Sequence, residues 1–392
     1  MILVLNAGSS SLRCALFRDG EDVALWRVHV AGIGGVAELT MKGDLDLDGD
    51  VPPDGDLGAV VDWLLARLRG MPNLDLRAAG HRIVHGGARH AGPARVDGHL
   101  IAELEALVPF APGHQPQGLA CIAAVGKAWP GLPQVACFDT AFHRSQDRLA
   151  QIEPIPRGLT EDGLLRFGFH GLSYAHVAGM LPKLIGDAAK GRIVVAHLGH
   201  GASLCAMEDG RSVATTMGLT TLGGLMMGTR SGTVDPGLVL HLIQARGMAA
   251  SEVADLLERR SGLLGVSGIS DDVRVLEASE APEAREALDL FAYRIARETG
   301  SLAVALGGLD ALVFTGGIGE NAAAIRADVC GRLACLGLDL DPVRNERGCM
   351  RIERIDATIP ILVMPADEER EIAQETEGLL GARMTASPSP TS

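Results

Sequence analysis

A hairpin pattern that occurs twice, half a chain apart, constrains the fold of this 392-residue chain more than any other feature. In residues 1–20, MILVLNAGSSSLRCALFRDG, an apolar run leads into an Asn/Gly/Ser turn, a second apolar run follows, and Asp19-Gly20 ends the segment. Residues 193–213, IVVAHLGHGASLCAMEDGRSV, repeat this order. Each copy predicts a strand, a tight polar turn and a second strand. Two copies predict a duplicated α/β architecture with a cleft between its halves.

The polar turns of both hairpins are suited to holding an anion. Small residues let backbone N–H groups and hydroxyls gather around a phosphate, as in phosphate-binding nests. For the first turn taken alone, an ordinary N-terminal hairpin is an equal alternative. The second copy is what favours a phosphate site.

Composition excludes several classes of partner. The net charge is -14 and aromatic residues make up 3% of the chain, which argues against nucleic acid and anionic membranes as partners. The longest apolar stretch, residues 302–319, is interrupted by Asp310 and glycines, so we expect no membrane span. Seven cysteines occur without a CxxC pair, which indicates reduced thiols and a cytoplasmic location.

A proline-punctuated segment near residue 150, QIEPIPRGL, predicts the domain boundary. We expect a first domain over 1–149, joined by a C-terminal helix at about 368–382 that packs back on it, and a second domain over 150–367. Residues 385–392 are expected to be disordered. Helices are predicted at 60–69, 118–129, 236–246, 251–260 with Ser251 as N-cap, 283–306 and 368–380.

Four side chains in these segments are candidates for chemistry. Arg82 in HRIVHGG and Arg230 in GTRSG stand among small residues, where a guanidinium can reach an anion; surface loop arginines are the alternative. Asp139 follows the apolar strand QVACF, a typical place for a carboxylate that faces a ligand. His170 in FGFHGLS suits a structural role as well as a catalytic one.

Two further segments point to a nucleotide and an acid cluster. Gly317-x-Gly319-x-x-Ala322 follows an apolar strand, but too little chain remains for a dinucleotide fold, so we interpret it as a turn that packs against a nucleotide. The acids 367–369 fit either a helix cap or a metal site. Phosphate turns, glycine-flanked arginines and isolated acids together indicate phosphoryl transfer.

The motifs LNAGSSSLR, HRIVHGG, FDTAFH, RFGFHG, HLGHGAS, GLMMGTRSG, SGLLGVSG, DALVFTGGIGEN and the final DEE resemble the acetate kinase family in order and spacing, from residue 2 to about 376. The resemblance implies a duplicated ribonuclease-H-like (actin-like ATPase) fold, with two domains around a nucleotide cleft, and a homodimer. It also implies the reaction ATP + acetate ⇌ ADP + acetyl phosphate by direct in-line transfer, with Mg²⁺ (or Mn²⁺) as cofactor.

The resemblance also implies roles for individual residues. Asp139, His170 and Arg230 would be catalytic, Arg82 would bind the substrate carboxylate, and Asn6 and Glu368 would be associated with the metal. The residues expected to bind ATP are Arg13, His197, Leu198, Gly199, His200, Gly201, Asp272, Val273, Arg274, Gly317, Ile318, Gly319, Glu320 and Asn321.

Several positions depart from the family pattern. His200 replaces an Asn, which suggests an altered pH dependence of nucleotide binding, and Leu172 and Tyr174 replace a Thr and a His. Thr221 and Gly223 replace a Pro and a Glu in a loop expected to wall the acyl pocket, so propionate is an alternative substrate. A sugar or polyol kinase and a slow ATP-hydrolysing scaffold protein are the competing functions.

Overall fold

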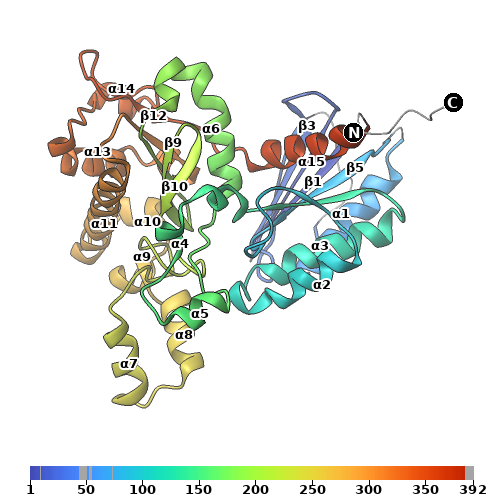
Figure 1. The fold of residues 1–392 in the computed structure, drawn as a ribbon, viewed down its shortest axis with the longest axis horizontal. Coiled ribbons are helices and arrows are strands. Elements are labelled where there is room, and N and C mark those ends of the chain that lie inside the picture. The colour runs from blue at the N-terminus through green and yellow to red at the C-terminus, as the bar shows by residue number, and fades with distance from the viewer. Residues whose placement is uncertain (9, 44–50, 53–54, 73, 385–392) are drawn as a thin grey trace. The chain divides into compact units, whose positions relative to one another are not determined.

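The computed structural model describes residues 1–8, 10–43, 51–52, 55–72 and 74–384. The chain divides into two compact units (Figure 1), one made of Met1–Arg144 and Asp367–Ser392 and the other of Ser145–Ala366. The segment 385–392, predicted to be disordered, and Ser9 of the first polar turn lie outside the described residues.

The first unit is built on a seven-stranded mixed sheet of order β4-β3-β2-β1-β5-β7-β6. Strands β1, β2 and β3 are antiparallel neighbours, whereas β1, β5 and β7 run parallel. The strands are β1 Ile2–Ala7, β2 Leu12–Phe17, β3 Ala24–Ala31, β4 Glu38–Gly43, β5 Ala78–Ile83, β6 Ala94–Arg95 and β7 Gln134–Phe138.

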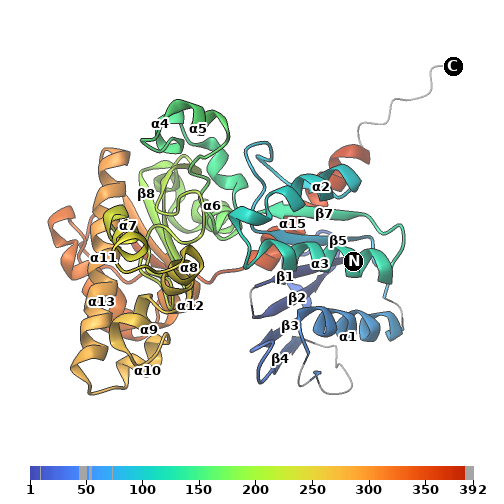
Figure 2. The same cartoon turned by 90° about the horizontal axis from the view of Figure 1, so that it is seen from below.

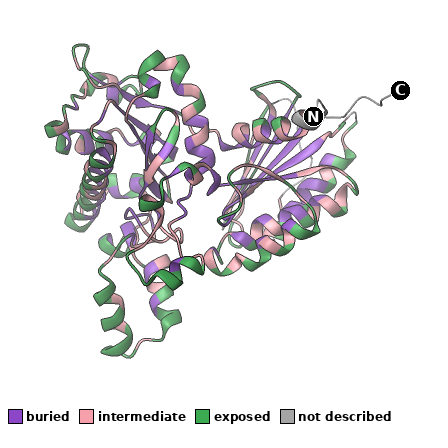
Figure 3. Cartoon of the chain, in the orientation of Figure 1, coloured by how far each residue is buried: buried purple, intermediate pink, exposed green. Residues whose placement is uncertain are grey.

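Helices cover both faces of this sheet (Figures 1 and 2). Leu3 and Leu5 of β1 form one core with helices α1 (Leu57–Gly70) and α3 (Gln115–Ala128). On the other face helix α15 (Glu368–Met384) packs against β1, β2, β5 and β7. With both faces covered, β1, β5 and β7 are buried at nearly every position rather than alternating between buried and exposed residues, and Figure 3 shows them as buried.

The second unit carries a five-stranded sheet of order β10-β9-β8-β11-β12. Its strands are β8 Ile193–Leu198, β9 Ala202–Glu208, β10 Arg211–Thr215, β11 Ala311–Thr315 and β12 Ile361–Val363. Helices α6 (Gly171–Ile185) and α11 (Pro282–Leu306) pack on this sheet. Helices α12 (Gly316–Asn321) and α13 (Ala323–Arg332) follow β11.

The two sheets share one topology, so the predicted duplication is confirmed. The order β3-β2-β1-β5-β7 in the first unit corresponds to β10-β9-β8-β11-β12 in the second. In each, an antiparallel hairpin stands beside a parallel strand, β1 with β5 and β8 with β11. The two similar sequence segments are the first hairpin of each unit, β1/β2 and β8/β9.

The other predicted helices are also present, but the N-cap residue predicted for one of them, α8, was wrong. Helix α8 begins at Ala250, and its N-cap is Ala249, whose backbone N–H donates to Glu252 Oε2 over 2.7 Å. Ser251 therefore lies inside the helix rather than at its N-cap, and at this end the Glu252 carboxylate binds the N-cap amide of Ala249. The other elements are α2 Gly98–Ala106, α4 Arg148–Gln151, α5 Arg157–Glu161, α7 Pro236–Gln244, α8 Ala250–Arg259, α9 Gly262–Ser267, α10 Val273–Glu277, α14 Pro342–Glu346 and the 3₁₀ turns Val108–Phe110, Ala141–Ser145, Gly186–Lys190 and Ala334–Leu336.

None of the helices within the described residues is both long enough and apolar enough to cross a membrane.

The close approach of β5 to α15 gives a stability prediction. A Cβ on Gly80 would lie 2.4 Å from Thr376 Oγ1 and 2.7 Å from Ile372 Cγ2, both on α15. Gly80→Ala should therefore lower the free energy of unfolding by about 1–3 kcal/mol, the usual cost of overpacking. Thermal unfolding measures it, with Gly92→Ala as the control because a Cβ there meets nothing within 4 Å. Equal melting temperatures for the two variants would contradict this packing.

Candidate active site

A buried ion pair lies where two parallel strands of the first unit end. Arg82, on β5, donates from Nη2 and Nε to Asp139 Oδ2, which follows β7, over 2.6 and 3.1 Å. Arg82 Nη1 donates to Asn6 Oδ1 on β1 over 3.2 Å. The carboxyl ends of neighbouring parallel strands lie at one sheet edge, which is where α/β proteins bind ligands. Three of the predicted site residues, Asn6, Arg82 and Asp139, are thus brought together.

The N-terminus of α15 brings acidic residues to the same edge. Asn6 Nδ2 donates to Glu368 Oε2 over 2.9 Å and to Glu369 Oε1 over 2.8 Å. On β3, Arg27 forms a bidentate ion pair with Asp367 at 2.8 and 2.7 Å and also donates to Glu369 over 3.3 Å. The segment 367–369 therefore places Glu368 at the site and anchors it through its neighbours.

The buried acid and base of this edge hold opposite charges at neutral pH. Burial raises the pKa of Asp139 most strongly and Glu368 adds to the rise, while Arg82 opposes it; the resulting pKa is about 6. Burial acts to lower the pKa of Arg82, but Asp139 and Glu368 outweigh it and raise that pKa. Both groups are therefore charged at pH 7.

The edge has features that suit a hard divalent cation. Asp139 Oδ1 is buried and has no hydrogen-bond partner, so one carboxylate oxygen is available. Mg²⁺ commonly takes one or two carboxylates and completes its shell with water and phosphate oxygens. Within the described part of the chain no group of three or more His, Cys, Asp or Glu side chains forms a complete metal cage. Asp139 and Glu368 fit such an ion better than Asn6, whose oxygen accepts from Arg82.

Arg13 is the remaining predicted residue of the first unit. It lies exposed on β2, and its positive charge acts on Glu369 and His29.

In the second unit, His170 has a backbone conformation typical of functional positions. It is the N-cap residue of α6 and adopts φ 59° and ψ 23°, in the left-handed region that residues other than glycine seldom occupy. Its Nδ1 lies 2.8 Å from Ser203 Oγ on β9. The ring stacks on that of His197 at a centroid distance of 4.3 Å, and His197 Nδ1 is held by Ser173 Oγ at 2.8 Å.

His170 and Arg230 converge on the polar turn between β8 and β9. A Cβ on Gly201 would lie 3.0 Å from Arg230 Nη2 and 3.4 Å from His170 Nε2, so both side chains end close to this glycine. Arg230 Nη1 donates to the carbonyl of Thr221 over 2.8 Å, which fixes the guanidinium from behind. An imidazole and a guanidinium that meet beside a glycine turn can stabilise a phosphoryl group.

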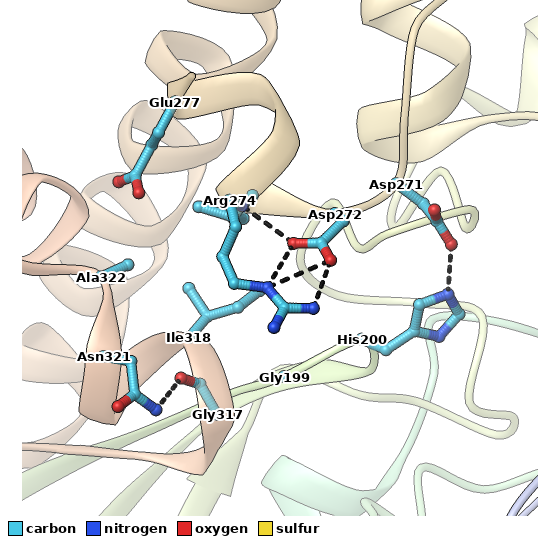
Figure 4. Close-up of a pocket in the computed structure, with 11 residues that line it drawn as sticks. Gly199, His200, Asp271, Asp272, Arg274, Glu277, Gly317, Ile318, Asn321 and Ala322 are labelled. Carbon is cyan, nitrogen blue, oxygen red and sulfur yellow. Dashed lines mark hydrogen bonds and ion pairs between the residues drawn. The ribbon is translucent and has the colours of Figure 1, made fainter. Parts of the chain in front are cut away.

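A cavity of about 660 Å³ extends from this turn in the second unit (Figure 4). Its volume is typical of a small-molecule site. The structure brings together three segments that the sequence analysis assigned to ATP, around 199, 272–274 and 317–321. The lining residues are Gly199, His200, Asp271, Asp272, Val273, Arg274, Glu277, Gly317, Ile318, Asn321 and Ala322.

Two side-chain contacts lie among the residues that line the cavity (Figure 4). His200 Nε2 lies 3.1 Å from Asp271 Oδ2, and Arg274 Nη2 pairs with Asp272 Oδ2 at 2.5 Å. Asp272 is also the N-cap of α10, since its side chain accepts from the Arg274 backbone N–H. Asp271 and Glu277 were missed by the sequence analysis, and for Asp271 the adjacent Asp272 was the available signal; Ala322 belongs to the glycine motif that was expected to pack against a nucleotide.

Some residues assigned to ATP lie outside this lining. Leu198 is buried in β8, and Gly319 packs its backbone near the Ala196 carbonyl. Glu320 Oε1 accepts from the Ala366 backbone N–H over 2.9 Å, and so fixes the last residue of the second unit. These three residues shape the cavity from behind.

The shared sheet topology and the two polar hairpins define a two-domain α/β protein of the actin-like class. The sequence profile described as "Acetokinase family" matches residues 1–374. The chain belongs to the acetokinase family, and the resemblance read from the motifs is confirmed.

Similar proteins support this assignment along the whole chain. An acetate kinase of Rhodopseudomonas palustris (strain ATCC BAA-98 / CGA009) is 51% identical over 388 residues, covering 95% of this chain and 97% of its own. A propionate kinase from Francisella tularensis subsp. tularensis SCHU S4 superposes with a TM-score of 0.88 at 35% identity, covering 96% and 99%. An acetate kinase from Porphyromonas gingivalis gives 0.86 at 35% identity, covering 97% and 99%. The predicted fold class is therefore confirmed.

Below the site, α15 carries two acids with raised pKa values. Glu371 and Glu375 lie one helical turn apart, and burial is the main cause that raises the pKa of each to about 7. Glu375 further raises the pKa of Glu371, whereas Cys137 on β7 lowers and Asp139 raises that of Glu375. Since each folded-state pKa exceeds the ordinary glutamate value of 4.5, both acids stabilise the fold below about pH 4.5, and this contribution is lost as the pH rises through 7.

Glu375→Gln should consequently stabilise the protein at alkaline pH. We expect a gain on the order of 1 kcal/mol at pH 8, which shrinks towards zero near pH 5, because glutamine cannot ionise. Melting temperatures across this pH range measure the effect. Glu286→Gln on the exposed face of α11 is the control. A gain that is independent of pH would show that Glu375 does not titrate as described.

Proposed function

We propose that this chain transfers the γ-phosphoryl group of ATP to acetate, producing ADP and acetyl phosphate. The observation that carries the proposal is the convergence of His170 Nε2 and Arg230 Nη2 on Gly201, in the polar turn of the β8/β9 hairpin. The named relatives support acetate as the acceptor, and the propionate kinase of Francisella tularensis supports propionate as a second substrate.

The cavity of the second unit is the proposed ATP site. Its walls at Asp272, Arg274 and Asn321 would hold adenosine, and the turn His197–Gly201 would hold the phosphates through backbone N–H groups. Arg13 would supply a further positive charge towards ATP. The other proposed ATP-binding residues are Leu198, Gly199, His200, Gly201, Val273, Gly317, Ile318, Gly319 and Glu320.

The ion pair of the first unit is the proposed acetate site. Arg82 would bind the acetate carboxylate with the N–H groups that face away from Asp139. Acetate is ionised at pH 7 and is already a nucleophile, so the reaction requires no strong base. Asp139 is ionised and engaged by Arg82, and its proposed role is to orient that guanidinium rather than to accept a proton.

The chemical step is a direct in-line transfer. An acetate oxygen forms the new bond to the γ-phosphorus while the bond between this phosphorus and the β–γ bridging oxygen breaks, and ADP leaves with the electron pair. In the transition state, negative charge is spread over the equatorial oxygens of the transferred phosphoryl group. His170 and Arg230 donate N–H groups to them there, which stabilises that charge more than the ground state.

A divalent cation is part of the proposal. Asp139 and Glu368, with Asn6 beside them, would hold Mg²⁺, and Mn²⁺ could replace it. The ion supplies charge neutralisation at the phosphates.

We also propose a cytoplasmic homodimer. Helix α7 has no buried residue, and Leu238, Leu240 and Ile243 on it are 44%, 53% and 36% exposed, an apolar surface that a second copy would cover. All seven cysteines are free thiols, which suits a reducing compartment. Sedimentation of the protein as a monomer at micromolar concentration would contradict the dimer. No nucleic acid or membrane is proposed as a partner.

Trapping the product tests the proposed activity. With ATP and Mg²⁺, the enzyme is offered acetate, propionate, butyrate or glycerol, and hydroxylamine converts any acyl phosphate to its hydroxamate. Acetate should give the highest kcat/KM, with propionate second. Absence of hydroxamate from every acid would refute a carboxylate kinase, and phosphorylation of glycerol would favour the sugar or polyol kinase instead.

Arg230→Ala should lower kcat far more than ATP affinity. Losing a donor that acts mainly in the transition state should reduce kcat about 10²- to 10³-fold, with the KM for ATP within about threefold. Arg18→Ala, an exposed arginine of the first unit, is the control and should behave as wild type. If the Arg230 variant changed only KM, this arginine would serve binding alone.

A further inference from the structure

We propose that Tyr174 is a positioning residue that, through Ser203, holds His170 in the tautomer with its proton on Nε2. The inference rests on the proposed function and deepens it, because it explains how a neutral His170 imidazole can present an N–H donor to the phosphoryl group.

The three side chains form a continuous buried series. Tyr174, in the first turn of α6, is fully buried, and its hydroxyl lies 2.5 Å from Ser203 Oγ. Ser203, on β9, is likewise fully buried, and its Oγ lies 2.8 Å from His170 Nδ1. Ser203 Oγ therefore links the Tyr174 hydroxyl to Nδ1 of His170, the ring nitrogen other than Nε2.

The direction of the hydrogen bonds can be assigned from the groups around the phenol. A backbone hydrogen bond from His197 acts to lower the pKa of Tyr174, as an N–H that donates to the phenol oxygen would. A phenol is a stronger acid, and therefore a stronger donor, than an aliphatic hydroxyl, so we assign the phenolic O–H as the donor to Ser203. Burial raises the pKa of Tyr174 well above its usual value, so the phenol keeps this proton throughout the working pH range.

The direction of the Tyr174–Ser203 hydrogen bond determines that of the bond between Ser203 and His170. Among the described residues its hydroxyl contacts Tyr174 and His170. If Nδ1 carried the proton and donated to Ser203, the serine hydrogen would be buried without an acceptor, which costs free energy. The serine O–H therefore donates to Nδ1, and the proton of the neutral imidazole resides on Nε2.

This tautomer is the one that the chemistry needs. Nε2 faces Gly201 and the tip of Arg230, where the phosphoryl group is proposed to lie. An Nε2–H group donates to a phosphoryl oxygen, whereas the opposite tautomer would present a lone pair that repels it. The stack on His197 keeps the ring from rotating and exchanging its two nitrogens. Fixing the tautomer of a catalytic histidine through a second group is worth a large factor in rate.

The alternative is that Tyr174 only fills the core between α6 and β9. Tyr174→Phe separates the two roles, since it removes the hydroxyl and keeps the ring. We expect kcat to fall about tenfold or more with the KM values for ATP and acetate within about twofold. Tyr293→Phe is the matched control, because Tyr293 is the other tyrosine of the chain and lies half-exposed on α11.

A spectroscopic readout tests the tautomer itself. With ¹⁵N-labelled histidine, the resonances of His170 are assigned as those missing in His170→Gln. In the wild type Nδ1 should show the shift of an unprotonated nitrogen and Nε2 that of a protonated one. Tyr174→Phe should move both towards averaged values, and Tyr293→Phe should leave them unchanged.

A double-mutant cycle separates the series from a loss of fold. Ser203→Ala should lower kcat at least as much as Tyr174→Phe, and the double variant should be no slower than Ser203→Ala alone, because both changes break one series. Additive losses, or a Tyr174→Phe protein with wild-type kcat and an unchanged ¹⁵N spectrum, would overturn the proposal. Wild-type enzyme that forms no acyl hydroxamate would instead refute the proposed function.

Discussion

The buried pair of Arg82 and Asp139 is the interaction on which the first half of the site depends. A charge removed from water is costly unless it is paired and hydrogen-bonded, and here the aspartate, with the oxygen of Asn6, satisfies the guanidinium. Asn6 in turn ties α15 to the sheet through Glu368 and Glu369. A positive group for the acceptor and carboxylates for a cation are thus held within one network. Its geometry follows from three parallel strands that end at one edge.

In the proposed mechanism, the second unit uses the same topology to bind ATP. Its first hairpin carries the glycine turn, and the side chains of His170 and Arg230 approach that turn from α6 and from the loop before α7. Duplication therefore accounts for the presence of two similar polar turns. In the proposed mechanism, the first turn follows Asn6 on the acceptor side, and the second would face the phosphates.

The sequence predicted the parts of this arrangement that depend on local pattern. The paired hairpins, the apolar central strands and the glycine turns carry their signal within about twenty residues, and they were found where expected. The predicted start of α8 was wrong because the helix begins at Ala250 with an alanine N-cap, whose amide is bound by the Glu252 carboxylate. The links from Asn6 to Glu369 and from Tyr174 to Ser203 join residues 363 and 29 positions apart, so no local pattern could reveal them. Tyr174 was noticed as a departure from the family, but its meaning required the position of Ser203.

The central claim is that an oxygen of the carboxylate itself attacks the phosphorus. The enzyme is supplied with ATP, Mg²⁺ and acetate labelled with ¹⁸O in both oxygens, and hydroxylamine then cleaves the acyl phosphate at its carbonyl carbon. The phosphate released should carry one ¹⁸O atom, visible as an isotope shift in the ³¹P spectrum, because the bridging oxygen comes from acetate. Phosphate without label, as in the control lacking acetate, would mean that the phosphoryl group passed to water and would contradict the account.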